Sequence, residues 1–131
     1  MSSNTPLNLS DLPIYKKAIE IFTLSQNIST YLNHDLSDLK DNGSENSHIY
    51  FSGDIVQQSV SLAPEILNAE RQRYSDKKYK HIASLKRLTS KLYKNSYRLE
   101  HSNSNGKDFL PILRSELNKF KKLQRTWMLT L

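Results

Sequence analysis

The fold is decided by the stretch at residues 77–100, which reads KKYKHIASLKRLTSKLYKNSYRLE. Its apolar residues recur every three or four positions, a spacing typical of one side of an α-helix. Ser75 and Asp76 come just before it, and both are residue types that favour a helix N-terminus. We therefore expect an amphipathic helix that turns one side toward a core. That side carries Ile82, Leu85, Leu88, Leu92, Ser96 and Leu99.

The same stretch carries basic residues along a second side. At about 100° per residue, five of them fall within a narrow arc that points away from the apolar side. No acidic residue occurs between Lys77 and Lys94, so the line lacks partners of opposite charge one turn away. Lys77 lies beside the arc, whereas Lys86 projects elsewhere. The arc consists of Lys80, Arg87, Lys91, Lys94 and Arg98.

Two helices are predicted before this stretch. The first accepts Pro13 in its first turn and runs through residues 14–32. The second covers residues 49–67 and contains Pro64, which cannot donate a hydrogen bond to the carbonyl four residues back. We expect a bend at Pro64, with a short break in the helix as the alternative.

A fourth helix is predicted at the C-terminal end. Asp108 is placed to cap it, Pro111 is tolerated in its first turn, and its apolar side includes Phe120. Trp127 lies on the same side, so we expect it in the core or in an interface.

Polar segments separate the four predicted helices. Residues 35–47 (DLSDLKDNGSENS) are acidic and centre on an Asn-Gly pair, which favours a loop, and residues 101–107 form a shorter polar loop. Short connections place successive helices antiparallel, so the sequence predicts an all-α fold, an antiparallel up-down-up-down four-helix bundle. The chain has 131 residues, enough for one domain, which we expect at residues 11–131 after a flexible segment at residues 1–10.

The composition argues against several classes of protein. The chain has no cysteine, which rules out disulfides, thiolate zinc sites and cysteine nucleophiles. The N-terminal segment lacks the charged and apolar regions of a signal peptide. No apolar run approaches the roughly 20 residues of a membrane span. We therefore expect a cytoplasmic protein that does not associate with membranes.

Charge is divided unevenly along the chain. Residues 1–70 hold three basic and nine acidic side chains, whereas residues 71–131 hold sixteen basic and four acidic ones. A concentrated cationic surface attracts polyanions over about 8 Å at physiological salt, so nucleic acid is the first partner to consider. A merely solvated helix face and a surface for an acidic protein are the two other interpretations.

The fourth predicted helix extends this basic surface. Lys107, Arg114, Lys121 and Arg125 form a second line, with Lys122 nearby. Two basic lines on consecutive helices could form one broad patch. The candidate nucleic-acid-binding residues are Lys77, Lys80, Arg87, Lys91, Lys94, Arg98, Arg114, Lys121 and Arg125.

Three tyrosines lie at the border between the apolar and basic sides of the stretch at residues 77–100. Tyr79, Tyr93 and Tyr97 can stack on exposed bases. The alternative is that each buries its ring and keeps its hydroxyl group in water.

Catalytic and metal-binding signals are weak. The four histidines show no spacing typical of metal ligands, and no glycine-rich phosphate loop or nucleophile motif occurs. We expect a non-enzymatic protein with no catalytic residues, no metal and no cofactor.

Several short motifs resemble one family. Residues 12–17 (LPIYKK) and 21–29 (IFTLSQNIS) resemble the first helix of small bacterial four-helix-bundle proteins. These include the accessory variability determinant (Avd) of diversity-generating retroelements and the proteins encoded in intervening sequences of ribosomal RNA genes. Residues 65–70 (EILNAE) leading to 74–78 (YSDKK) resemble the junction of helices two and three, and residues 123–131 resemble the last helix.

The resemblance implies a ring-like homopentamer with a basic surface. In the accessory proteins that surface binds nucleic acid and the retroelement reverse transcriptase. Residues 61–64 and 66–69 depart from the signature of the intervening-sequence branch, which favours the accessory branch. No single functional residue carries over.

Three functional hypotheses follow. The first is an accessory protein that binds RNA or DNA through phosphate contacts, with a reverse transcriptase as the implied partner. The second is an interaction scaffold that self-assembles, with Lys91 and Arg98 of one subunit against carboxylates such as Asp54 or Glu65 of another. An enzyme ranks last.

Overall fold

The computed structural model describes residues 8–36, 48–101 and 105–131. Within these ranges all regular secondary structure is helical and no strand occurs, in agreement with the predicted all-α class. Two short 3-10 helices accompany the α-helices. In chain order the elements are η1 (Leu9–Asp11), α1 (Pro13–Leu36), α2 (His48–Val60), α3 (Leu62–Arg71), α4 (Ser75–Leu99), η2 (Asn105–Phe109) and α5 (Leu110–Met128).

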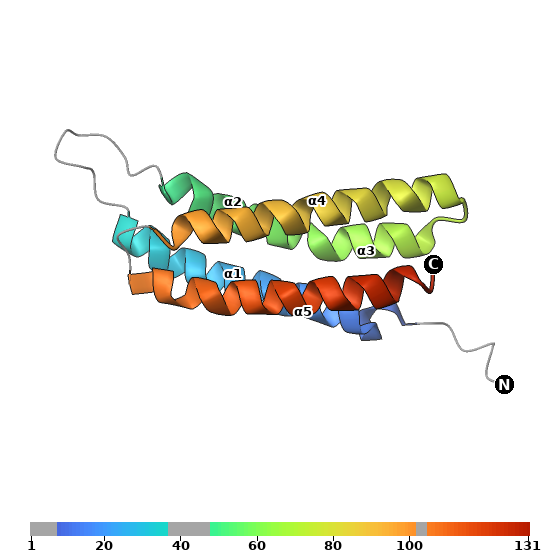
Figure 1. Ribbon diagram of the computed structural model, residues 1–131, viewed down its shortest axis with the longest axis horizontal. Helices are drawn as coiled ribbons and strands as arrows, with labels where there is room; N and C mark the ends of the chain where they lie inside the picture. The colour runs from blue at the N-terminus through green and yellow to red at the C-terminus, as the bar shows by residue number, and fades with distance from the viewer. Residues whose placement is uncertain (1–7, 37–47, 102–104) are drawn as a thin grey trace.

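The helices lie side by side along the long axis of the molecule (Figure 1). Only Ser61 separates α2 from α3, so the two count as one interrupted helix and the described residues form four helical segments. α1 packs against α2 and α5, and α4 packs against α2, α3 and α5. No helix in the described ranges is long and apolar enough to cross a membrane.

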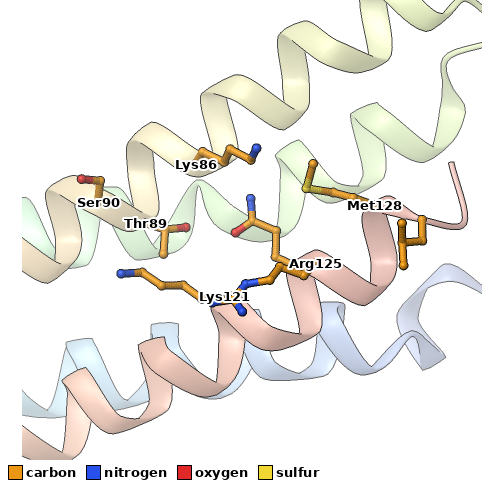
Figure 2. A pocket seen from close by; sticks show the side chains of 8 residues that line it. Lys86, Thr89, Ser90, Lys121, Arg125 and Met128 are labelled. Carbon is orange, nitrogen blue, oxygen red and sulfur yellow. The ribbon is translucent and has the colours of Figure 1, made fainter.

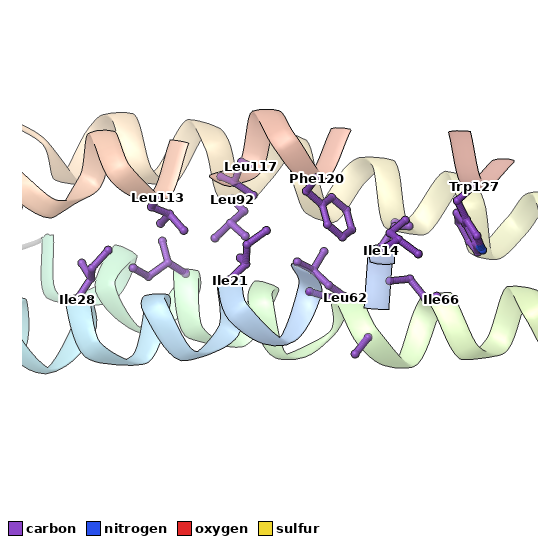
Figure 3. Packing of buried hydrophobic residues seen from close by; sticks show 14 of the residues in the cluster. Ile14, Ile21, Ile28, Leu62, Ile66, Leu92, Leu113, Leu117, Phe120 and Trp127 are labelled. Carbon is purple, nitrogen blue, oxygen red and sulfur yellow. The ribbon is translucent and has the colours of Figure 1, made fainter. Parts of the chain in front are cut away.

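Apolar residues from every α-helix fill one core (Figure 3). Ile21, Leu62, Leu92 and Phe120 are fully buried there, and Trp127 closes one end of the cluster. Burying a side chain of this size contributes about 1.5 to 3 kcal/mol, so the apolar spacing read from the sequence accounts for the packing. On α4 the residues predicted to face inward are buried, apart from Leu88, which is partly buried.

The chain breaks between α2 and α3, in agreement with the short break that was the alternative to a bend at Pro64. Pro64 is the third residue of α3, and the break occurs three residues earlier, at Ser61. The Ser61 hydroxyl donates to the Gln57 carbonyl oxygen at 3.0 Å, and the Ser61 N–H reaches the Gln58 carbonyl oxygen at 3.3 Å. The chain therefore breaks before the proline, because one irregular residue there lets Pro64 occupy a first turn.

Two predicted caps differ in the structure. Ser75 and Asp76 lie inside the first turn of α4, and the N-cap is Tyr74, whose side chain makes no capping bond. Asp108 lies in η2, and the N-cap of α5 is Phe109. Phe109 already has α-helical backbone angles, because η2 continues directly into α5, so no side-chain cap is needed at that junction.

The predicted loop at residues 35–47 and the N-terminal segment fall largely outside the described residues, whereas residues 105–107 of the second predicted loop belong to η2. Residues 1–7, 37–47 and 102–104 are not described. Leu9 and Ser10, from the segment expected to be flexible, take part in η1, where the Asn8 carboxamide oxygen accepts the Ser10 N–H at 3.2 Å. α1 also extends four residues beyond Leu32, into the start of the segment expected to be a loop.

Candidate functional site

The basic side of α4 is exposed along its whole length. Its six cations occupy one side of the helix, and the buried residues Leu85, Leu92 and Leu99 occupy another. At about 1.5 Å per residue, the eighteen steps from Lys80 to Arg98 span roughly 27 Å. We call this surface the α4 stripe; it consists of Lys77, Lys80, Arg87, Lys91, Lys94 and Arg98.

Contacts on both flanks of the α4 stripe turn it away from the other helices. On one flank the Asn95 amide of α4 donates to Gln58 of α2 at 3.1 Å. On the other flank the ammonium of Lys121 in α5 lies 4.5 Å from the centre of the Tyr93 ring. Because neighbours occupy both flanks, the side between them faces outward.

The α4 stripe is electrostatically uncompensated over its middle. Lys80, Arg87, Lys91 and Lys94 form no ion pair with any residue that the structure describes. Two glutamates next to α4 contact other residues: Glu65 lies 3.2 Å from His81, and Glu100 lies 2.8 Å from Arg114. The middle of the stripe, from Lys80 to Lys94, therefore keeps its positive charge facing water.

Arg114 does not share this exposure. Its side chain is 17% exposed, one guanidinium nitrogen contacts Glu100 at 2.8 Å, and the group lies 5.8 Å from the centre of the Tyr97 ring. The hydrogen bond with Glu100 raises the pKa of Arg114, and the same bond lowers the pKa of Glu100. Arg114 thus joins the end of α4 to α5, and the structure separates it from the α4 stripe.

The two remaining candidates on α5 lie at a groove. Lys121 and Arg125 line it from α5, and Lys86 and Ser90 line it from α4 (Figure 2). We call this the α4–α5 groove, and its volume is about 440 Å³. Its lining residues are Lys86, Thr89, Ser90, Lys121, Gln124, Arg125, Met128 and Leu129.

Of the residues that line the groove, sequence reasoning had proposed only Lys121 and Arg125 as site residues. Lys86 was correctly placed off the α4 stripe, but no sequence pattern indicated that it lines one groove with Lys121 and Arg125. Gln124 is 4% exposed, and its amide nitrogen has no hydrogen-bond partner within the described structure. A polar residue on the apolar side of the last predicted helix was the available signal for Gln124.

The border tyrosines differ in how far they are exposed. Tyr93 is partly buried against the core, whereas Tyr79 and Tyr97 are 66% and 56% exposed. Trp127 lies in the core, which was one of the two locations predicted for it. Its indole N–H donates to the Glu70 carboxylate at 2.7 Å. Tyr79 and Tyr97 are therefore the aromatic rings on α4 that a base could reach.

Titratable clusters are sparse. No group of three or more histidine, aspartate or glutamate side chains close enough to hold a metal ion occurs in the part of the chain that the structure describes. Glu65 and His81 lie 3.2 Å apart, and the Asn68 amide also donates to Glu65 at 3.4 Å. These contacts join α3 to α4.

Comparisons with known proteins give no relative: no family model matches the chain, and no curated protein or solved structure matches it significantly.

Proposed function

We propose that this protein is a nucleic-acid-binding accessory protein without enzymatic activity, and that the α4 stripe contacts the phosphates of the bound strand. The observation that carries the proposal is the row of exposed cations without carboxylate partners in the middle of α4. Phosphate contacts of this kind supply affinity without reading sequence. Specificity would then come from the shape of the nucleic acid or from a second protein.

The proposed architecture is an antiparallel up-down-up-down four-helix bundle, of the kind that the Avd resemblance implies. The packing of α1 on α2 and α5, and of α4 on α2, α3 and α5, supports this arrangement. In such a bundle the α4 stripe presents a straight, rigid row of charge. A reverse transcriptase as partner and a homopentameric ring are further parts of this proposal that rest on the resemblance alone.

Fluorescence anisotropy at low salt tests the proposed function. A labelled single strand of RNA or DNA should bind the full chain, and the logarithm of the binding constant should fall linearly with the logarithm of the salt concentration. The slope should be roughly −0.7 to −0.9 per phosphate neutralised. Absence of binding at low salt, or binding that salt does not weaken, would falsify the proposal.

Self-assembly as an interaction scaffold is the second candidate, and one apolar cluster favours it. Tyr31 of α1 and Phe109 of η2 stack with ring centres 5.5 Å apart, although they are 57% and 40% exposed. Ile112, one turn further along α5, is also half exposed. Apolar side chains gathered on a surface often mark an interface between proteins.

Sedimentation velocity distinguishes the two routes to self-assembly. Assembly through Tyr31 and Phe109 should persist at high salt and be lost in Tyr31→Ser, because apolar contacts are insensitive to screening. Assembly through acidic and basic halves, with Lys91 and Arg98 against Asp54 or Glu65 of another subunit, should dissociate as salt rises. A monomer at all salt concentrations would remove this candidate.

A further inference from the structure

The α4–α5 groove has the dimensions of a small-molecule site. Its volume of about 440 Å³ lies within the roughly 300 to 1,000 Å³ that such sites occupy. It is built on two helices that also contribute to the core, so its walls are held in place. α4 supplies one wall and α5 the other (Figure 2).

Gln124 supplies a hydrogen-bond donor that nothing in the described chain uses. The residue is 96% buried, since only 4% of its surface is exposed, and its amide nitrogen has no partner. A buried N–H group without an acceptor is costly and therefore uncommon. Because Gln124 lines the groove, a ligand with an acceptor oxygen would satisfy it there.

The charge around Gln124 specifies an anion. Lys86, Lys121 and Arg125 line the groove, and no carboxylate of the described residues does. Ammonium and guanidinium groups donate hydrogen bonds and accept none. A phosphate group offers several oxygens to such donors at once, and the forked guanidinium of Arg125 suits it.

Thr89 offers a hydrogen-bond acceptor to a ligand in the groove. The Thr89 hydroxyl donates to the Leu85 carbonyl oxygen at 2.8 Å, so toward the groove it can only accept. A sugar hydroxyl would provide that donor. Phosphate acceptors and a sugar donor occur together in a nucleotide.

The far end of the groove is apolar and open. Met128 and Leu129 line it, and both also line a neighbouring hollow of about 390 Å³ that Arg73, Lys78 and Tyr79 border. The Met thioether contacts flat rings favourably, and exposed tyrosine rings stack on bases. A flat ring over Met128 would therefore have the exposed ring of Tyr79 nearby.

We propose that the α4–α5 groove binds one unstacked nucleotide, with its phosphate held by Lys121, Arg125 and the Gln124 amide and its base lying over Met128 toward Tyr79. The nucleotide is free or belongs to a single strand; a duplex does not fit, because its bases are paired and stacked. The choice of a nucleotide rests on the proposed function, whereas the requirement for a phosphate group rests on the groove itself.

Calorimetric titration with adenosine 5′-monophosphate tests the groove on the full chain. The charge-removing variant Lys121→Gln/Arg125→Gln should bind the nucleotide at least about tenfold more weakly than the original protein. Lys16→Gln/Lys119→Gln removes the same charge elsewhere on the surface and should change the affinity by less than about twofold. Equal weakening in both variants overturns the proposal, and so does the absence of binding to the original protein.

The variant Gln124→Met tests whether the Gln124 amide contributes to nucleotide binding independently of protein stability. The substitution removes an unsatisfied donor and keeps the volume, so the melting temperature should stay the same or rise. Affinity for adenosine 5′-monophosphate should nevertheless fall about fivefold, the loss of one hydrogen bond. Unchanged affinity in this folded variant contradicts the assignment of Gln124.

Further probes distinguish the source of the phosphate and the role of the base. Inorganic phosphate should bind more weakly than adenosine 5′-monophosphate, because it leaves Met128 and Tyr79 without contact; equal affinity overturns the placement of the base. A single-stranded trinucleotide should compete with the monophosphate, and a duplex of the same sequence should not. Competition by the duplex to the same extent contradicts the requirement for an unstacked base.

The proposed function and this inference can fail separately. If long strands do not bind but adenosine 5′-monophosphate binds as described, the proposed function fails and the groove stands as a site for a free nucleotide. If long strands bind with the expected salt dependence but the monophosphate does not bind, the α4 stripe stands and the groove is rejected.

Discussion

Lysine and arginine have different surroundings in the α4 stripe and in the two ion pairs that α5 forms, Lys17–Glu116 and Arg114–Glu100. Arg87 and Lys91 of the stripe are exposed and have no carboxylate partner in the described structure. Lys17 and Arg114 are only 18% and 17% exposed, and each contacts a glutamate of a different helix or helix cap. The difference shows that a basic residue near a core joins helices together, whereas one beyond the reach of any carboxylate is available to a partner.

Charge reversal on the α4 stripe should give the largest effect. Arg87→Glu/Lys91→Glu should weaken binding to a labelled single strand on the order of a hundredfold at low salt and reduce the salt slope by about two, because two phosphate contacts are lost. The free energy of unfolding, measured by urea titration, should change by no more than about 0.5 kcal/mol.

A matched control shows whether position matters more than net charge. Lys16→Glu/Lys119→Glu makes the same change in net charge on α1 and on the side of α5 near it. Lys119 contacts Glu116 at 3.3 Å but is 60% exposed, so losing that pair costs little. If this control weakens binding as much as the stripe variant, the α4 stripe is not the interface.

Arg114→Gln should lower stability and leave nucleic-acid binding nearly unchanged, the reverse of the effect expected for Arg87→Glu/Lys91→Glu. It breaks the pair with Glu100 and removes the guanidinium from beside Tyr97, so unfolding should become easier by about 1 to 2 kcal/mol. Affinity for the single strand should change by less than about twofold, because one partly buried charge contributes little to a distant phosphate. If Arg114→Gln greatly weakens binding to the single strand and leaves the free energy of unfolding unchanged, Arg114 belongs to the nucleic-acid-binding surface after all.

Lys17→Met should have a smaller effect on stability. Lys17 contacts Glu20 at 2.6 Å and Glu116 at 2.9 Å, and these hydrogen bonds raise its pKa. Removing the ammonium leaves Glu116 with its exposed contact to Lys119, so we expect a loss of about 1 kcal/mol in urea titration. Lys16→Met, the exposed neighbour, should cost less than about 0.5 kcal/mol. Equal losses would show that the α1–α5 ion pair adds nothing.

Acid should weaken the ion pairs and leave the charge of the α4 stripe intact. The bonds from Lys17 to Glu116 and from Arg114 to Glu100 hold the pKa of each glutamate below its ordinary value of 4.5. Their contribution to stability is therefore present above pH 4.5 and is lost as the pH falls through the lowered values. Melting curves between pH 6 and pH 3, taken as a series on the order of half a unit apart, should show a smaller fall in Arg114→Gln than in the original protein.

The helices were predictable because their signals are local. The spacing of Leu85, Leu92 and Leu99 predicted α4 with its buried side, and Pro13 and Pro111 fell in first turns as expected. The caps at Ser75 and Asp108 were wrong, and before Pro64 the helix breaks, which was the alternative to the expected bend. Each of these depends on how one helix joins the next, and the backbone at the joint is set by packing on both sides.

The candidate site was predictable only where it lies on one helix. All six residues of the α4 stripe are exposed, as the single-helix geometry required. On α5 the basic residues predicted to form one line have different surroundings. Arg114 pairs with Glu100, whereas Lys121 and Arg125 line the α4–α5 groove. Spacing along α5 carries no information about which carboxylate or which helix lies opposite each residue.

The sequence alone determined which residues share a side of a helix, because the 3.6-residue period is fixed by backbone hydrogen bonding. It therefore placed the apolar positions of α4 and its exposed row of cations. Tertiary structure alone decided which sides meet: it took Arg114 into an ion pair with Glu100, and it brought Lys86, Lys121 and Arg125 around the buried amide of Gln124. The physical reason is that contacts between helices depend on how their sides pack together across the core, and no spacing within a single helix records that choice.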